Sequence, residues 1–113
     1  MESELTANFF PEQQELAEFA KALGHPARIA ILEILAAKAT CICGEIVEQL
    51  PLSQSTVSQH LKVLKDAGII QGEISGPRTC YCLSHQGVSR ISELLSAFIS
   101  KMQAGTVSSG SCC

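Results

Sequence analysis

Six cysteines occur in this chain of 113 residues, and their arrangement is three close pairs. The pairs are Cys41 with Cys43, Cys80 with Cys82, and Cys112 with Cys113. Residues two apart in a strand point to the same side, so each Cys-X-Cys pair can present both sulfurs in one direction. In a reducing compartment such thiols indicate binding of a thiophilic ion or redox sensing rather than structural disulfides.

Thiolates with no histidine beside them select soft ions. Three sulfurs suit As(III) or Sb(III), and up to four suit Cd(II), Pb(II) or Zn(II). The adjacent pair Cys112–Cys113 favours trivalent arsenic, which chelates neighbouring thiols readily. We predict arsenite as the first candidate effector and cadmium or lead as the second. A thiol oxidoreductase or metal carrier is the alternative of another class, but no thioredoxin-like βαβ pattern supports it, and we predict no catalytic residues.

The elements that position these thiols belong to one small domain. The chain can bury about two-thirds of its surface, carries a net charge of −3, and has no apolar run of membrane-spanning length and no basic leader. We therefore expect a cytoplasmic protein. The basic residues slightly outnumber the acidic ones between residues 51 and 83, so any favourable field for nucleic acid is local.

Two helical patterns joined by a tight connection lie between Gly44 and Gly68. Pro51 ends the first pattern, which carries Ile46, Val47 and Leu50. In the second, Val57, Leu61 and Leu64 recur at i, i+4 and i+7 after the N-cap candidate Ser53. The other face of this second helix is polar and opens with short side chains, as a helix in a DNA major groove requires.

Two alternating strands follow, 69–74 and 78–83, around a turn at Ser75-Gly76-Pro77. A helix-turn-helix followed by such a hairpin is a winged helix. We predict a mainly α protein with a small β-wing, ordered as two helices, a short strand at 39–43, two helices, two strands and a last helix. The short strand is expected to pair with the second wing strand, and Tyr81 and Leu83 to lie on the face opposite Cys80 and Cys82.

The segments SQSTVSQHLKVLKDAGII (53–70), ALGHPARIAILEIL (22–35) and TCICGEIV (40–47) closely resemble the ArsR/SmtB family of metal-responsive bacterial repressors. The likeness covers roughly residues 12 to 102. It implies a homodimer that binds an imperfect palindromic operator and releases it when an ion binds. The alternative within the same fold is a thiol-redox sensor, in which two cysteines oxidise instead of binding metal. The implied DNA contacts are Gln54, Ser55, Thr56, Ser58, Gln59 and His60 toward base edges or nearby phosphates, and Lys62 and Arg78 toward phosphates.

The resemblance also implies metal ligands at Cys41 and Cys43, where the family's arsenic and cadmium sensors carry theirs. A third family cysteine, one turn later, is replaced here by Ile46. The third sulfur is expected from the tail pair Cys112–Cys113, because ten extended residues span up to about 33 Å. The wing pair, Cys80 and Cys82, is the close second. The family's zinc site on the last helix is not possible, since the corresponding positions are His85, Gly87, Phe98 and Lys101.

Three divisions are expected: an N-terminal arm at 1–11, a DNA-binding and dimerisation domain at 12–103, and a flexible tail at 104–113. The last helix carries a long apolar stripe, which one small core cannot cover. We predict that it forms the dimer seam together with the first helix. The stripe consists of Val88, Ile91, Leu94, Leu95, Phe98 and Met102.

Overall fold

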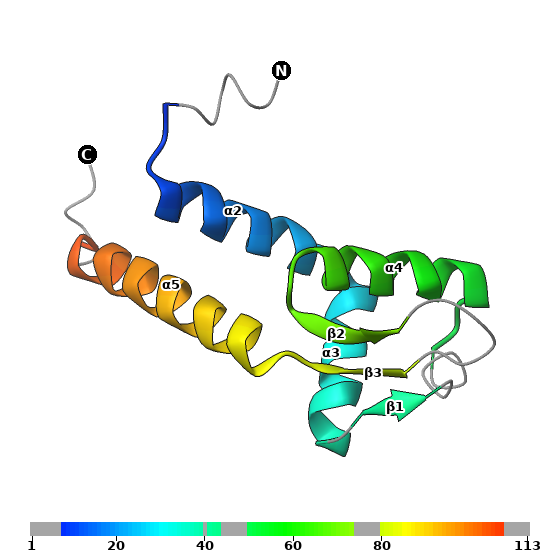
Figure 1. Cartoon of the computed structure of the whole chain (residues 1–113). Helices are drawn as coiled ribbons and strands as arrows, with labels where there is room; N and C mark the ends of the chain where they lie inside the picture. The colour runs from blue at the N-terminus through cyan, green and yellow to red at the C-terminus, as the bar shows by residue number, and fades with distance from the viewer. Residues whose placement is uncertain (1–7, 40, 44–49, 74–79, 108–113) are drawn as a thin grey trace.

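The computed structural model describes residues 8–39, 41–43, 50–73 and 80–107. Four helices and three strands follow one another in these ranges (Figure 1). The helices are α2 (Pro11–Leu23), α3 (Pro26–Lys38), α4 (Gln54–Asp66) and α5 (His85–Ala104), and the strands are β1 (Ile42–Cys43), β2 (Ile70–Glu73) and β3 (Cys80–Leu83). None of the helices in the described part is long and apolar enough to cross a membrane. The predicted helix at 44–50, the wing turn with Arg78, and the Cys112–Cys113 pair fall mainly or wholly outside the described residues.

Local sequence sets where the first two helices begin. Pro11 occupies the first turn of α2, where a missing backbone donor is harmless. Pro26 does the same for α3, and the N-cap residue His25 accepts a hydrogen bond at Nδ1 from the backbone N–H of Ala27 at 3.0 Å. Gly24 and His25 separate the two helices.

The core gathers the inward faces of the helices against the sheet. Ile31 and Leu35 of α3 and Val57, Leu61 and Leu64 of α4 are all buried. The spacing that predicts the buried stripe of α4 is therefore confirmed. The polar residue Ser53 accepts a hydrogen bond at Oγ from the Thr56 N–H at 3.3 Å and caps α4. The apolar pattern of residues 26–38 predicts that Ile29 points inward together with Ile31 and Leu35, but Ile29 is 41% exposed.

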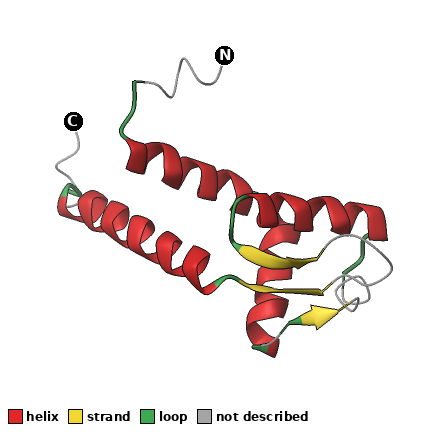
Figure 2. Cartoon of the chain, in the orientation of Figure 1, coloured by secondary structure: helices red, strands yellow, loops and turns green. Residues whose placement is uncertain are grey.

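The sheet has the order β1-β3-β2, and both pairs of strands are antiparallel (Figure 2). This confirms that the short strand pairs with the second wing strand. Ile42 faces Tyr81 across β1 and β3, and both side chains are buried. Tyr81 therefore turns inward, and Leu83, on the same face, packs against the core. The alternate residues Cys80 and Cys82 lie on the other face, as the alternation predicts.

The turn between α4 and β2 is the point at which three elements meet. Gly68 adopts a positive φ of 81°, which glycine enters without strain. Ile69 donates its N–H to the Leu64 carbonyl and accepts from the Ser84 N–H at 2.9 Å. Gly87, in the first turn of α5, lies so close that a Cβ atom there would run into the Gly68 carbonyl oxygen. The start of α5 is thus fixed to the end of α4.

Candidate DNA-binding surface and cysteine cluster

The outer face of α4 presents a row of polar side chains to solvent. Gln54, Ser55, Gln59 and Lys62 are exposed, and Thr56 and Ser58 are half-buried. In Figure 1 this helix lies at one side of the molecule, beside the hairpin of β2 and β3. Amide and hydroxyl groups on an uncovered helix face can donate to and accept from base edges, while a lysine suits a phosphate. Seven of the eight DNA-contact candidates lie on α4; Arg78, the eighth, is outside the described residues.

The first turn of α4 holds a short chain of hydroxyl groups. Ser53 donates from Oγ to Thr56 Oγ1 at 2.9 Å, and Ser53 and Ser55 share a hydrogen bond at 3.2 Å. These bonds order the side chains that would enter a groove first. At the other end, Lys62 pairs with Asp66 at 3.4 Å, and both side chains are about two-thirds exposed. Such an i, i+4 pair contributes at most about 0.5 kcal/mol, so a phosphate can replace the carboxylate.

His60 is placed differently from the other α4 candidates. Its Nδ1 accepts a hydrogen bond from Nε of Arg28 at 3.2 Å, and its ring lies 4.4 Å from that of His25, centre to centre. Burial lowers the pKa of His60, and the charges of His25 and Arg28 lower it further. The half-buried, neutral ring therefore packs against the α2–α3 corner. Its predicted role at base edges stays a prediction, and packing is the contact present.

The sequence alone predicts no role for Arg28. Besides His60, it donates through Nη1 to the carbonyls of Lys21 and Ala22 at 3.1 and 3.0 Å. These carbonyls belong to the last turn of α2, which has unpaired acceptors and a partial negative charge. One guanidinium thus joins α2, α3 and α4. The only signal in the sequence is an arginine two residues after the helix-starting Pro26.

Four cysteines meet where β1 and β3 run side by side. We name Cys41, Cys43, Cys80 and Cys82 the sheet cysteines. Cys41 and Cys82 form a disulfide, with their Cα atoms 4.2 Å apart. Cys80 is disulfide-bonded as well, and the residue whose Cα faces it on β1 is Cys43. Cys41 is exposed, and Cys80 and Cys82 are half-buried. The amide of Gln71, on β2, contacts the Cys82 sulfur at 3.9 Å.

This arrangement limits which cysteines can supply a third sulfur ligand. Within the described residues, no group of three or more His, Cys, Asp or Glu side chains is disposed to hold a metal ion. The Cys43 side chain and both tail cysteines are not among them. The register nonetheless brings two Cys-X-Cys pairs to the same place on neighbouring strands. After reduction, this set offers the sulfur ligands that soft ions prefer.

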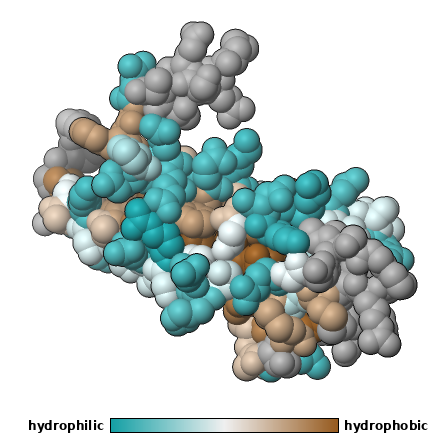
Figure 3. Space-filling view, viewed as in Figure 1, coloured by the Kyte–Doolittle hydropathy of each residue, from teal (hydrophilic) through white to brown (hydrophobic). Residues whose placement is uncertain are grey.

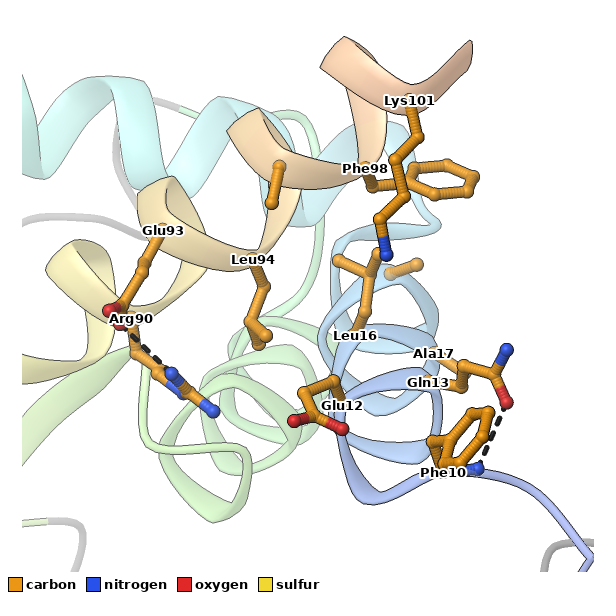
Figure 4. Close-up of a pocket in the computed structure, with 12 residues that line it drawn as sticks. Phe10, Glu12, Gln13, Leu16, Ala17, Arg90, Glu93, Leu94, Phe98 and Lys101 are labelled. Carbon is orange, nitrogen blue, oxygen red and sulfur yellow. Dashed lines mark hydrogen bonds and ion pairs between the residues drawn. The ribbon is translucent and has the colours of Figure 1, made fainter. Parts of the chain in front are cut away.

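An apolar groove of about 870 Å³ runs between α2 and α5. Figure 4 shows Leu16 of α2 and Leu94 and Phe98 of α5 directed toward this groove, with Phe10 at its end. In Figure 3, apolar surface emerges between the hydrophilic side chains along this pair of helices. Several of the stripe residues remain exposed in the single chain, with fractions of 38–48% for Val88, Leu95, Phe98 and Met102.

A double ion pair holds the groove's two walls together. Arg90 of α5 donates to both carboxylate oxygens of Glu15 on α2, at 2.7 and 2.9 Å, and also to Glu93 at 2.9 Å. The hydrogen bonds from Arg90 hold the pKa of Glu15 below its ordinary value. Those carboxylates raise the pKa of Arg90 in turn. The bidentate hydrogen bonding between Arg90 and Glu15 fixes the relative position of α2 and α5 more strictly than a single contact would.

A capped helix with an uncovered polar face, preceded by a helical corner and followed by a two-stranded wing, defines a winged-helix DNA-binding regulator. Comparison with known proteins gives the family. Residues 25–71 match the model described as "Bacterial regulatory protein, arsR family". The chain belongs to this family of transcriptional regulators, whose members act by binding DNA rather than by catalysis.

Two curated relatives and one solved structure illustrate the likeness. An uncharacterised HTH-type transcriptional regulator of Methanocaldococcus jannaschii is 36% identical over 73% of this chain and 92% of its own length. An arsenical resistance operon repressor of Staphylococcus xylosus is 32% identical over 73% of this chain and 78% of its own. The solution structure of a homodimeric winged helix-turn-helix domain of Mycobacterium bovis superimposes with a TM-score of 0.59, at 26% identity, covering 79% of this chain and 82% of that one.

Proposed function

We propose that the protein is a repressor that binds operator DNA as a dimer in the cytoplasm and dissociates when a thiophilic ion, foremost arsenite, binds its cysteines. The observation that carries this proposal is the meeting of Cys41 with Cys82 across β1 and β3. It puts thiols from two distant segments beside each other in a regulator of the arsR family. Such a set suits a soft ion and has no evident part in binding DNA.

The ligand set follows from the register. Cys41 and Cys82 supply two adjacent sulfurs, and Cys43 or Cys80 supplies the third from the neighbouring cross-strand position. This favours the wing over the tail as the source of the third sulfur, the reverse of the order that the sequence suggests. The tail pair, Cys112 and Cys113, remains the competing source, and its position is not described.

DNA binding is assigned to the outer face of α4 together with the wing. Gln54, Ser55 and Gln59 are the exposed residues that would contact base edges. Lys62 would exchange Asp66 for a phosphate, and Arg78 of the wing turn would hold another. His60 would hold α4 in position through its hydrogen bond with Arg28 of α3.

The dimer is assigned to α2 and α5. α5 keeps exposed apolar side chains beside the groove, whose other wall is α2, and a second copy would offer the same surface in return, as a twofold interface requires. The Staphylococcus relative is named as a repressor, which supports repression by analogy. The Mycobacterium domain is named as a homodimer, which supports the dimer by analogy.

The path from ion to DNA runs through the sheet. An ion that draws β1 and β3 sulfurs into its coordination sphere changes the spacing of these strands. β3 is paired along its length with β2, and β2 is joined to α4 by the turn at Gly68. A change in strand spacing would therefore be transmitted through β3 and β2 to α4. A hundredfold loss of operator affinity requires about 2.7 kcal/mol of coupling between ion and DNA.

The test is a titration of reduced protein, bound to an operator duplex selected from random sequences, with arsenite, cadmium and zinc. We expect release at the lowest concentration with arsenite. Release by cadmium or zinc but not arsenite would support the alternative of a divalent-metal sensor. Retention of DNA with every ion would overturn ion sensing while leaving DNA binding intact.

A further inference from the structure

Three of the four sheet cysteines are oxidised, while the described helices and strands are all in place. Cys41 and Cys82 are joined, and Cys80 is disulfide-bonded too. A sulfur in a disulfide has no thiolate to offer, and soft ions are bound by thiolates. At most one sheet cysteine is then left as a ligand, too few for a three-sulfur site.

The same oxidised chain keeps the surface assigned to DNA. Gln54, Ser55, Gln59 and Lys62 are exposed, and α4 remains capped by Ser53. Strands β2 and β3 are in register beside it. The disulfide lies on the β1–β3 side of the sheet, where it does not cover α4. Its formation removes the ion's ligands without removing the residues that would bind the operator.

We infer that the Cys41–Cys82 pair is a reversible thiol–disulfide switch that makes the repressor insensitive to its ion while operator binding persists. The inference rests on the proposed function, because it concerns regulation of the same ion site. Access supports it, since Cys41 is exposed and Cys82 is half-buried, within reach of a small oxidant. Cross-strand neighbours need no large backbone movement to form the bond.

The chemistry is balanced with a peroxide as oxidant. One thiolate attacks a peroxide oxygen and breaks the O–O bond, which gives a sulfenic acid and, after protonation of the leaving oxygen, one water. The second thiolate attacks the sulfenic sulfur, the S–S bond forms, and the hydroxyl leaves as a second water. Two electrons pass from the two sulfurs to the peroxide, and the two thiol protons end in the waters. A dithiol reductant reverses the process by exchange.

The experiment compares full-length protein that is fully reduced with protein oxidised by stoichiometric hydrogen peroxide. Fluorescence anisotropy reports affinity for the selected operator duplex, with and without arsenite, and peptide mass mapping locates the disulfide. We expect a Cys41–Cys82 link, unchanged operator affinity, release by arsenite of the reduced form only, and recovery of the response with dithiothreitol. The Cys112→Ser/Cys113→Ser variant should behave in the same way and serves as the matched control.

Three results would overturn the switch: an oxidised protein that arsenite still releases, an oxidised protein that loses the operator, or the absence of the Cys41–Cys82 link. Failure of the proposed function is distinct, because the reduced protein would then keep the operator in arsenite and in cadmium. A Cys41→Ser/Cys82→Ser variant adds a check that does not depend on ions. Its operator binding should be the same with and without peroxide, as in the wild type, and a loss of the operator on oxidation of both proteins would overturn the switch, because peroxide would then act on DNA binding through other residues.

Discussion

Arg28 and His60 are hydrogen-bonded from Nε to Nδ1 at 3.2 Å, and this bond fastens α4 to the corner of α2 and α3. The imidazole nitrogen can accept only while it is unprotonated, so the ring must be neutral. Burial lowers the pKa of His60, and the nearby charges of His25 and Arg28 act in the same direction. Protonation would replace an acceptor by a cation facing an arginine.

This arrangement predicts a specific pH dependence of stability. The folded pKa lies below the ordinary histidine value of 6.5, so the unfolded chain binds the proton more readily. The stability due to His60 is therefore fully present above the ordinary pKa and is lost as pH falls through the lowered, folded pKa. His60→Gln should flatten the dependence of the unfolding free energy on pH in that window, measured by denaturant titration. The exposed His85→Gln variant is the control, and equal curves for wild type and His60→Gln would refute the assignment.

A second prediction separates base contacts from phosphate contacts. Gln59→Ala should weaken specific binding by about 1–3 kcal/mol, because an exposed amide on α4 is lost from the groove. Arg78→Ala should weaken binding to all duplexes and reduce the salt dependence, because it removes one phosphate contact. Anisotropy at several salt concentrations measures both, with the exposed Gln86→Ala of α5 as control. If neither variant differs from wild type, the DNA-binding surface has been misassigned.

The dimer provides a third prediction. Phe98 is 44% exposed in the single chain and borders the groove between α2 and α5. Phe98→Asp would bury an unpaired charge in the proposed seam, at a penalty of several kcal/mol, and should yield monomers in sedimentation velocity. Ser96→Asp adds the same charge to the exposed opposite side of α5 and should stay dimeric. A monomeric wild type would remove the basis for a palindromic operator.

The sequence predicts those parts of the fold that depend on local spacing. Val57, Leu61 and Leu64 indicate one buried helical face whatever surrounds them, and Ser53 marks its start. The Cys41–Cys82 bond is different, because the two cysteines are 41 residues apart in the chain and meet only through the register of β1 against β3. Alternation shows which way Cys82 points but not which residue lies opposite. The Arg28–His60 contact likewise requires the crossing of two helices, which no short segment determines.

Gly87 gives a fourth prediction, for stability. A Cβ atom at this position would meet the Gly68 carbonyl and the Ile69 Cα, which are backbone atoms that cannot turn aside. Gly87→Ala should therefore lower the free energy of unfolding by about 1–3 kcal/mol and loosen the link between α5 and the end of α4. Gly105→Ala is a matched control, because the nearest atoms lie at an ordinary contact distance of 3.6 Å. Thermal or urea unfolding distinguishes the two, and an equally stable Gly87→Ala would show that the helices can separate there.

The last prediction compares how much each cysteine pair contributes to the arsenite response of the reduced protein. Cys41→Ser/Cys43→Ser should abolish release by arsenite and leave operator affinity nearly unchanged, because a hydroxyl is similar in size but a poor ligand for a soft ion. Cys80→Ser/Cys82→Ser should impair release as well if the sheet supplies the third sulfur, while removal of Cys112 and Cys113 should have little effect. Impairment by the tail deletion alone would assign the third sulfur to the tail. X-ray absorption on the arsenite complex should show three sulfurs at one short distance, and a full arsenite response in the Cys41/Cys43 double variant would refute the site.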